Sequence, residues 1–95
     1  MKFAILVFSD PSLVLTALYS KMGDGEKCPT GQRIQCESIC KEASSELGLT
    51  WSSAWNGPSD VPGCIFANDG RSKVYFNTAL TATGSNSKYA AICSG

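Results

Sequence analysis

The sequence predicts an α+β domain in which a single amphipathic helix packs on a small antiparallel sheet and disulfide bonds staple the fold together. The 95 residues include five cysteines and no histidine. Apolar residues recur at spacings of three and four over residues 34–47, and three short strand-like segments with turns between them follow. A core of this size supplies about 3 to 5 kcal/mol on its own. Disulfide bonds, each worth about 2 to 4 kcal/mol, are the expected supplement.

Residues 1–20 form an apolar N-terminal segment, in which a lysine is followed by apolar runs at positions 3–8 and 13–18. One interpretation is a secretory signal peptide, with a weak cleavage candidate at its end. The other is that the segment is retained as two short strands that turn at residues 9–12. The apolar stretch is short and interrupted by polar residues and a proline, so we expect no stable membrane span.

Retained apolar strands need a partner that covers them. An apolar strand left uncovered in one copy of the chain can complete the sheet of the next copy. Head-to-tail contacts of this kind generate an open homo-polymer unless they close into a ring. The positions assigned to such assembly are all apolar: Phe3, Ile5, Val7, Leu13, Leu15 and Leu18.

Residues 21–27 are predicted to be a polar hinge between this segment and a cysteine-rich module, residues 28–95. Within the module, residues 50–62 contain an Asn-Gly-Pro step and end at a Pro62-Gly63 step, and both are typical of turns and irregular structure. The organisation is therefore one module with an N-terminal extension. We find no internal repeat and no low-complexity tract.

The helix is predicted over residues 34–47. Glu37 and Lys41 stand in the favourable i to i+4 order on its polar side. Gly48 suits a left-handed C-terminal cap, with Leu49 folded back beside the helix. The side predicted to be buried carries Cys36, Ile39, Cys40, Ala43 and Leu47.

Three strands are predicted in the second half of the module, at residues 64–67, 73–76 and 89–93. The first two flank a polar segment centred on Asp69-Gly70, and an Asp-Gly pair between strand-like segments is a strong hairpin signal. The sequence therefore predicts an antiparallel pair, with the last strand added after a polar loop.

Four short motifs carry a resemblance to a known class of module. They are Cys40 with Leu47-Gly48-Leu49, then Pro62-Gly63-Cys64, then Val74-Tyr75-Phe76-Asn77, and finally Ile92-Cys93. In this order they resemble small, uncharacterised, cysteine-rich secreted modules of algae and other microbial eukaryotes. The resemblance implies the fold and a secreted, extracellular location, and it implies no activity. It also implies disulfide bonding of Cys28, Cys40, Cys64 and Cys93, with Cys36 as the unpaired thiol.

The connectivity stays open at this stage. Five choices of the unpaired cysteine, each leaving three connectivities, give fifteen arrangements. The pattern permits Cys40 with Cys64 and Cys28 with Cys93, which we adopt as a working hypothesis. For Cys36 we favour a buried, inert thiol on the helix; pairing between subunits and exchange with Cys40 are the alternatives.

The residue types weigh against several classes of function. Without histidine the chain lacks the commonest general base, and Asp60 and Asp69 are better explained as solvated turn residues than as a catalytic pair. The chain has no C-x-x-C pair, so we expect no metal and no cofactor. The net charge is zero with no run of one sign, so nucleic acid is not an expected partner. We therefore expect a protein that is not an enzyme and has no catalytic residues.

Two functions remain. The first is a structural subunit of an extracellular fibre or coat, assembled through the N-terminal strands. The alternative is a soluble, secreted, lectin-like binding module for glycans or surface adhesion, from which residues 1–20 are removed. Aromatic rings cover the apolar faces of sugars while amides and carboxylates bind hydroxyl groups. The simpler explanation of two tryptophans four residues apart is that they cap the small core. The candidate glycan-binding residues are Trp51, Trp55, Asn56 and Asp60, with Tyr75 and Asn77 as further members.

Overall fold

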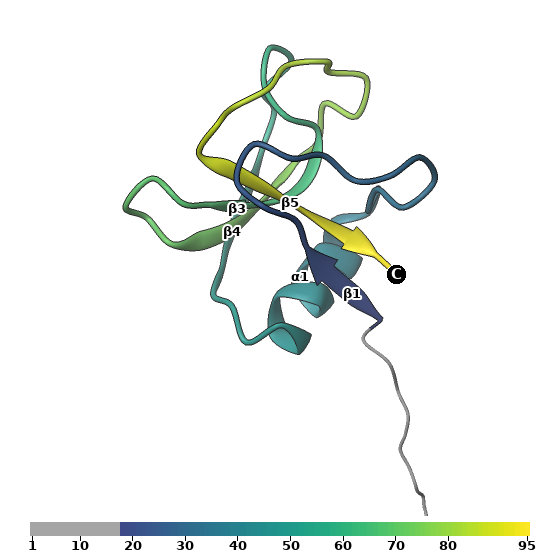
Figure 1. The fold of residues 1–95 in the computed structure, drawn as a ribbon, viewed down its shortest axis with the longest axis vertical. Coiled ribbons are helices and arrows are strands. Elements are labelled where there is room, and N and C mark those ends of the chain that lie inside the picture. The colour runs from purple at the N-terminus through teal and green to yellow at the C-terminus, as the bar shows by residue number, and fades with distance from the viewer. Residues whose placement is uncertain (1–17) are drawn as a thin grey trace, which may run out of the picture.

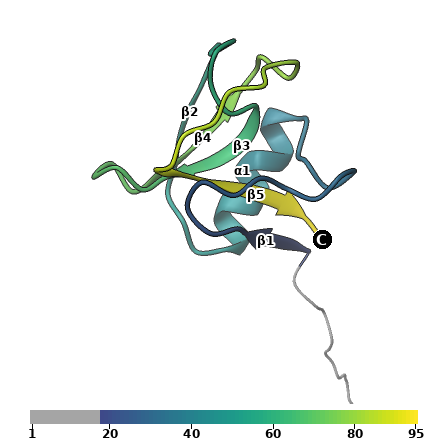
Figure 2. The same ribbon diagram turned by 45° about the horizontal axis from the view of Figure 1, so that its top comes forward.

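The structure is a computed structural model that describes residues 18–95 of the chain. It confirms the α+β class, because one helix lies on one side of a five-stranded sheet (Figures 1 and 2). The elements are β1 (Tyr19–Lys21), α1 (Glu37–Glu46), β2 (Trp51–Trp55), β3 (Gly63–Ala67), β4 (Lys73–Asn77) and β5 (Tyr89–Ser94). In the sheet the strands lie in the order β1-β5-β3-β4-β2.

The sheet is mixed, so the prediction of an antiparallel sheet is wrong for one pairing. The hairpin predicted around Asp69-Gly70 is confirmed, and β3 also runs antiparallel to β5. β2, however, pairs in parallel with β4. After β2 the chain reverses and forms β3. The hairpin then reverses it again, so β4 lies between β3 and β2 and runs in the same direction as β2. The sequence does not predict this strand, because a bulge interrupts its alternation and turn signals follow it directly.

The helix is shorter than predicted and begins three residues later. Cys36 is its N-cap residue and has extended backbone angles, φ −139° and ψ 132°. Its side chain is therefore exposed, which corrects the prediction of a buried thiol. Ile39 is also exposed, and the buried side of α1 consists of Cys40, Ala43 and Ser44.

The end of α1 follows the prediction closely. Gly48 has a φ of +71°, a left-handed conformation that glycine adopts without steric cost. Its N–H donates to the carbonyl of Ser45, and the N–H of Leu49 donates to the carbonyl of Ser44. This pair of bonds is the Schellman arrangement, which satisfies two carbonyls that a helix end leaves free. It turns the chain directly into β2.

The main core lies between α1 and the sheet. The Cys40–Cys64 disulfide crosses it and ties the helix to β3. Val74 and Phe76 of β4 are buried in this core, and the partly buried Leu47 and Leu49 pack against its edge. The other buried members are Tyr19, Ile34, Ala43 and Ile92.

The chain between β1 and α1 is bonded to the sheet along much of its length. The N–H groups of Met22 and Gly25 donate to carbonyls of β5, over N···O distances of 2.9 and 2.8 Å. The second disulfide, Cys28–Cys93, joins the same segment to the end of β5. Residues 21–27, which are predicted to be a hinge, thus lie alongside β5 and are hydrogen-bonded to it (Figure 1).

Five of the six positions assigned to assembly, Phe3, Ile5, Val7, Leu13 and Leu15, lie outside the described residues. The sixth, Leu18, is the first residue that the structure describes, and 60% of it is exposed. The next residue, Tyr19, is buried in the main core at the start of β1. The boundary predicted after residue 20 therefore falls inside a strand of the folded domain.

Candidate functional site

The two faces of the sheet differ in what covers them. α1 covers one face, and side chains alternate along each strand, so Val74 and Phe76 point toward the helix while Tyr75 points to the opposite face. That opposite face, the open face, has a small apolar base of Val61, Ile65 and Ala67. Three half-buried aromatic rings pack on this base: Trp55, Tyr75 and Tyr89.

A bulge in β2 places the two tryptophans on different faces. Trp51 pairs with Val74 and Ser53 pairs with Tyr75, so β2 carries one extra residue between them. The extra residue shifts the alternation by one position. Trp51 therefore packs into the core beneath α1, with the Lys41 ammonium 5.6 Å from its ring. The structure does not bring Trp51 to Trp55, and only Trp55 belongs to the open face.

The three aromatic rings of the open face form one cluster. Trp55 contacts Tyr75 edge-on, with 6.1 Å between ring centroids, and Tyr89 at 6.3 Å. Together with Ser53 and Arg71, they line a depression of about 150 Å³, which we call the aromatic hollow. Edge-to-face contacts are a favourable geometry for aromatic rings, so each ring holds its neighbours in place.

Arg71 holds the side of the aromatic hollow. Its guanidinium carbon lies 4.7 Å from the ring centroid of Tyr75, and one of its nitrogens donates to the hydroxyl of Tyr89 at 2.9 Å. Two nitrogens also donate to the carboxylate of Asp69, the shorter bond being 2.6 Å. Asp69 in the turn, Tyr75 on β4 and Tyr89 on β5 thereby hold the arginine beside the rings.

The Arg71–Asp69 pair also shifts the titration of the acid. The hydrogen bonds from Arg71 lower the pKa of the Asp69 carboxyl to about 2 from 3.8. Because this pKa is lowered in the folded state, the stabilisation from the pair is complete above about pH 4 and is lost as the pH falls toward 2. The hollow therefore keeps its arrangement across the neutral range.

The polar candidates from the sequence lie elsewhere. Asn77 is fully buried, and its side chain bonds the backbone of Gly57, Val61 and Ala79. Asp60 accepts a hydrogen bond from the N–H of Val61 in its own loop, and Asn56 is exposed beyond the end of β2. None of the three lines the aromatic hollow.

Sequence reasoning missed Tyr89 and Arg71. Tyr89 could have been found from the sequence. The last strand begins at this residue, and its alternation puts Tyr89 on the same face as Ala91. Arg71 gave no comparable signal. It follows the Asp-Gly turn as an ordinary solvated residue would, and its contacts arise only when β4 and β5 lie on either side of β3.

Cys36 is the free cysteine of the described part of the chain and lies at the start of α1. Its sulfur is 3.1 Å from the hydroxyl oxygen of Ser38. This hydrogen bond, with the backbone N–H groups of Ile39 and Ser38, lowers the pKa of the thiol below its usual value. An exposed thiol of this kind reacts more readily than a buried one.

Comparisons with protein-family models, curated proteins and solved structures find no match. Within residues 18–95, no group of three metal-binding side chains comes together. The same residues contain no helix long and apolar enough to span a bilayer. The geometry defines a small α+β domain held by two disulfides, with an aromatic hollow on the sheet face opposite its helix.

Proposed function

We propose that this chain is a non-enzymatic, extracellular binding module that recognises a glycan through its open face. The single observation that carries the proposal is the cluster of Trp55, Tyr75 and Tyr89 on a sheet face that the helix leaves free. Soluble domains usually bury large aromatic rings, so a half-buried cluster beside polar groups favours a recognition surface.

The chemistry around the rings suits a sugar. The rings offer flat apolar surface to the C–H face of a pyranose, while the Ser53 hydroxyl and the Arg71 guanidinium offer hydrogen bonds at the margin. At about 150 Å³ the hollow is smaller than the roughly 300 to 1,000 Å³ of enclosed ligand pockets. We therefore expect shallow contact with one sugar ring, of the kind that supports adhesion to a polysaccharide surface.

Trp55→Ala is expected to weaken glycan binding at least about tenfold, because truncating a central aromatic residue removes most of the contact energy of a small site. Trp51→Ala is the matched control, since that ring lies under α1 on the other face. Both variants and the parent would be screened on a glycan array and then titrated by calorimetry with the best ligand.

Circular dichroism verifies that each variant is folded, and Trp51→Phe replaces the control if Trp51→Ala does not fold. Trp55→Phe keeps a ring in the hollow and should recover part of the affinity. Equal binding by the parent and Trp55→Ala would refute the proposed site, and a parent that binds no glycan would refute the proposed function.

A second candidate function is the structural subunit of an extracellular fibre or coat, assembled through the apolar N-terminal strands. One observation favours it: residues 1–17 lead directly into β1, which is an edge strand of the sheet. Edge strands expose unpaired backbone groups that a strand from another copy can extend. The exposed Leu18 stands at this junction.

Deleting residues 1–17 tests the assembly directly, because it retains β1 and the buried Tyr19. If the strands cross between copies, the full chain sediments as a polymer and the shortened chain as a folded monomer. Deleting residues 1–20 is a poorer test, since it removes a residue of the main core. A shortened chain that still polymerises, or a natural protein that is a monomer beginning near Lys21, would contradict the assembly.

A further inference from the structure

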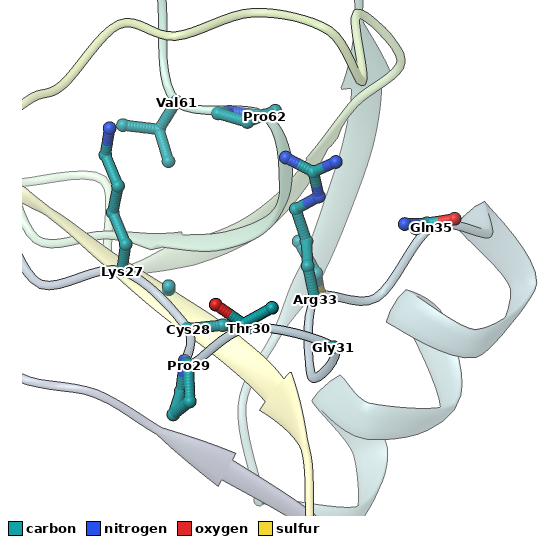
Figure 3. A pocket seen from close by; sticks show the side chains of 11 residues that line it. Lys27, Cys28, Pro29, Thr30, Gly31, Arg33, Gln35, Val61 and Pro62 are labelled. Atoms are coloured by element: carbon teal, nitrogen blue, oxygen red, sulfur yellow. The ribbon is translucent and has the colours of Figure 1, made fainter.

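A second hollow lies beside the aromatic one. It has a volume of about 290 Å³ and is bounded by the loop of residues 28–31 on one side and by Val61 and Pro62 on the other. Figure 3 shows that the Lys27 ammonium and the Arg33 guanidinium flank it, both pointing toward the Val61–Pro62 side. We call it the cationic hollow.

The two cations of this hollow are not neutralised within the domain. Among residues 18–95, neither Lys27 nor Arg33 forms an ion pair, and no carboxylate lines the hollow. Arg33 is also held in position, because its side-chain stem lies across Gly63. A Cβ atom at Gly63 would come within 3.0 Å of the Arg33 Cγ. The glycine thus allows the arginine to lie flat against β3 with its charged end at the hollow.

The two hollows share one face of the sheet and are close together. Tyr89 lines the aromatic hollow and Ala91 lines the cationic hollow. They lie two residues apart on β5, so their side chains point to the same face at a spacing of about 7 Å. Val61 borders the cationic hollow and also belongs to the apolar base under the aromatic rings. A ligand longer than one sugar ring can therefore contact both hollows.

We propose that the open face selects an anionic oligosaccharide, which places a sugar ring on Trp55 and the carboxylate or sulfate of a nearby sugar between Lys27 and Arg33. This inference rests on the proposed glycan-binding function and specifies its ligand class. A guanidinium binds carboxylates and sulfates through paired hydrogen bonds, and an ammonium adds a point charge. A neutral glycan would leave both cations without a partner, so charge provides the selectivity.

The test compares matched acidic and neutral ligands on the full oxidised chain. Tetragalacturonate is titrated against its full methyl ester, and a sulfated galactan tetrasaccharide against its desulfated form. We expect at least one acidic ligand to bind about tenfold tighter than its neutral counterpart, with a preference that shrinks as salt rises from 50 to 200 mM. The pair that shows the preference identifies carboxylate or sulfate as the recognised group.

The double variant Lys27→Gln/Arg33→Gln should lose this preference and keep the affinity of the parent for the neutral ligand. Lys21→Gln/Lys41→Gln is the matched control, because it removes the same charge where the two lysines lie over Phe66 and Trp51 on the helix side. It should keep the preference.

Three results would overturn the inference. Acidic and neutral forms of both glycans that bind the parent equally would remove the charge selectivity while leaving the proposed function intact. A preference that survives Lys27→Gln/Arg33→Gln would place the anion elsewhere. A hexaglutamate peptide that binds as tightly as the acidic glycan would show that charge alone is recognised, with no role for the sugar ring.

Discussion

Replacing Cys40 and Cys64 together by alanine is expected to lower the free energy of unfolding by more than 3 kcal/mol, which is most of the stability of a domain this small. The bond closes a loop with a sequence separation of 24 residues, and restricting the unfolded chain over that span is worth about 3.5 kcal/mol. Both cysteines are also buried, so the two lost sulfurs leave a void in the core between α1 and β3.

The same replacement at Cys28 and Cys93 should cost about 4 kcal/mol from chain entropy alone, because the sequence separation is 65 residues. Urea unfolding followed by circular dichroism measures both changes. Cys36→Ser serves as background and control, since its hydroxyl can retain the contact with Ser38 and its site is exposed. It should leave the unfolding midpoint unchanged. Midpoints of both double variants close to that of Cys36→Ser would contradict a disulfide-dependent fold.

The second large effect is expected at Asn77. Asn77→Ala should destabilise the domain by about 3 to 4 kcal/mol, because four backbone groups lose their partner at once and each buried, unpaired polar group costs about 1 to 3 kcal/mol. Gly57 and Val61 belong to the loop between β2 and β3, and Val61 forms part of the apolar base of the open face. Asn68→Ala removes an exposed amide bonded to Asp24 and should change stability by less than about 0.5 kcal/mol.

Asn77→Asp makes the effect depend on pH. A carboxylate there faces the carbonyls of Gly57 and Val61 instead of donating to them. Burial and these oxygens raise the pKa of such an acid in the folded state. The variant is therefore relatively stable at low pH and loses stability as the pH rises through the raised pKa. Unfolding measured at pH 4 and pH 7 checks this, and equal loss of stability at both values would contradict a raised pKa at residue 77.

The local elements of this fold could be predicted from the sequence, whereas the relations between distant segments could not. The helix, its glycine cap and three of the strands follow from spacing and turn chemistry. β2 was missed because the bulge between Trp51 and Ser53 breaks the alternation that marks a strand. Its parallel partner, β4, lies beyond a loop and a hairpin, where no short pattern can connect the two.

The candidate site shows the same limit. Trp55 and Tyr75 could be named in advance because large aromatic residues near turns are conspicuous. Asn77 could not be distinguished from a ligand-binding amide, since its role depends on which backbone groups surround it. The N-cap position of Cys36 reversed a prediction that helical spacing alone supported. Such roles depend on the tertiary arrangement, which local sequence does not encode in a readable form.

The pairing of β1 with β5 has a practical consequence. Tyr19 lies opposite Ser94, and the N–H of Gly95 donates to the carbonyl of Leu18 at 2.7 Å. The first and last residues that the structure describes are thus joined by one hydrogen bond. Domains whose ends meet in this way tolerate insertion into a host protein. We therefore expect that residues 18–95 can be inserted as a unit into an exposed turn of a display scaffold, with β1 and β5 both joined to the host chain.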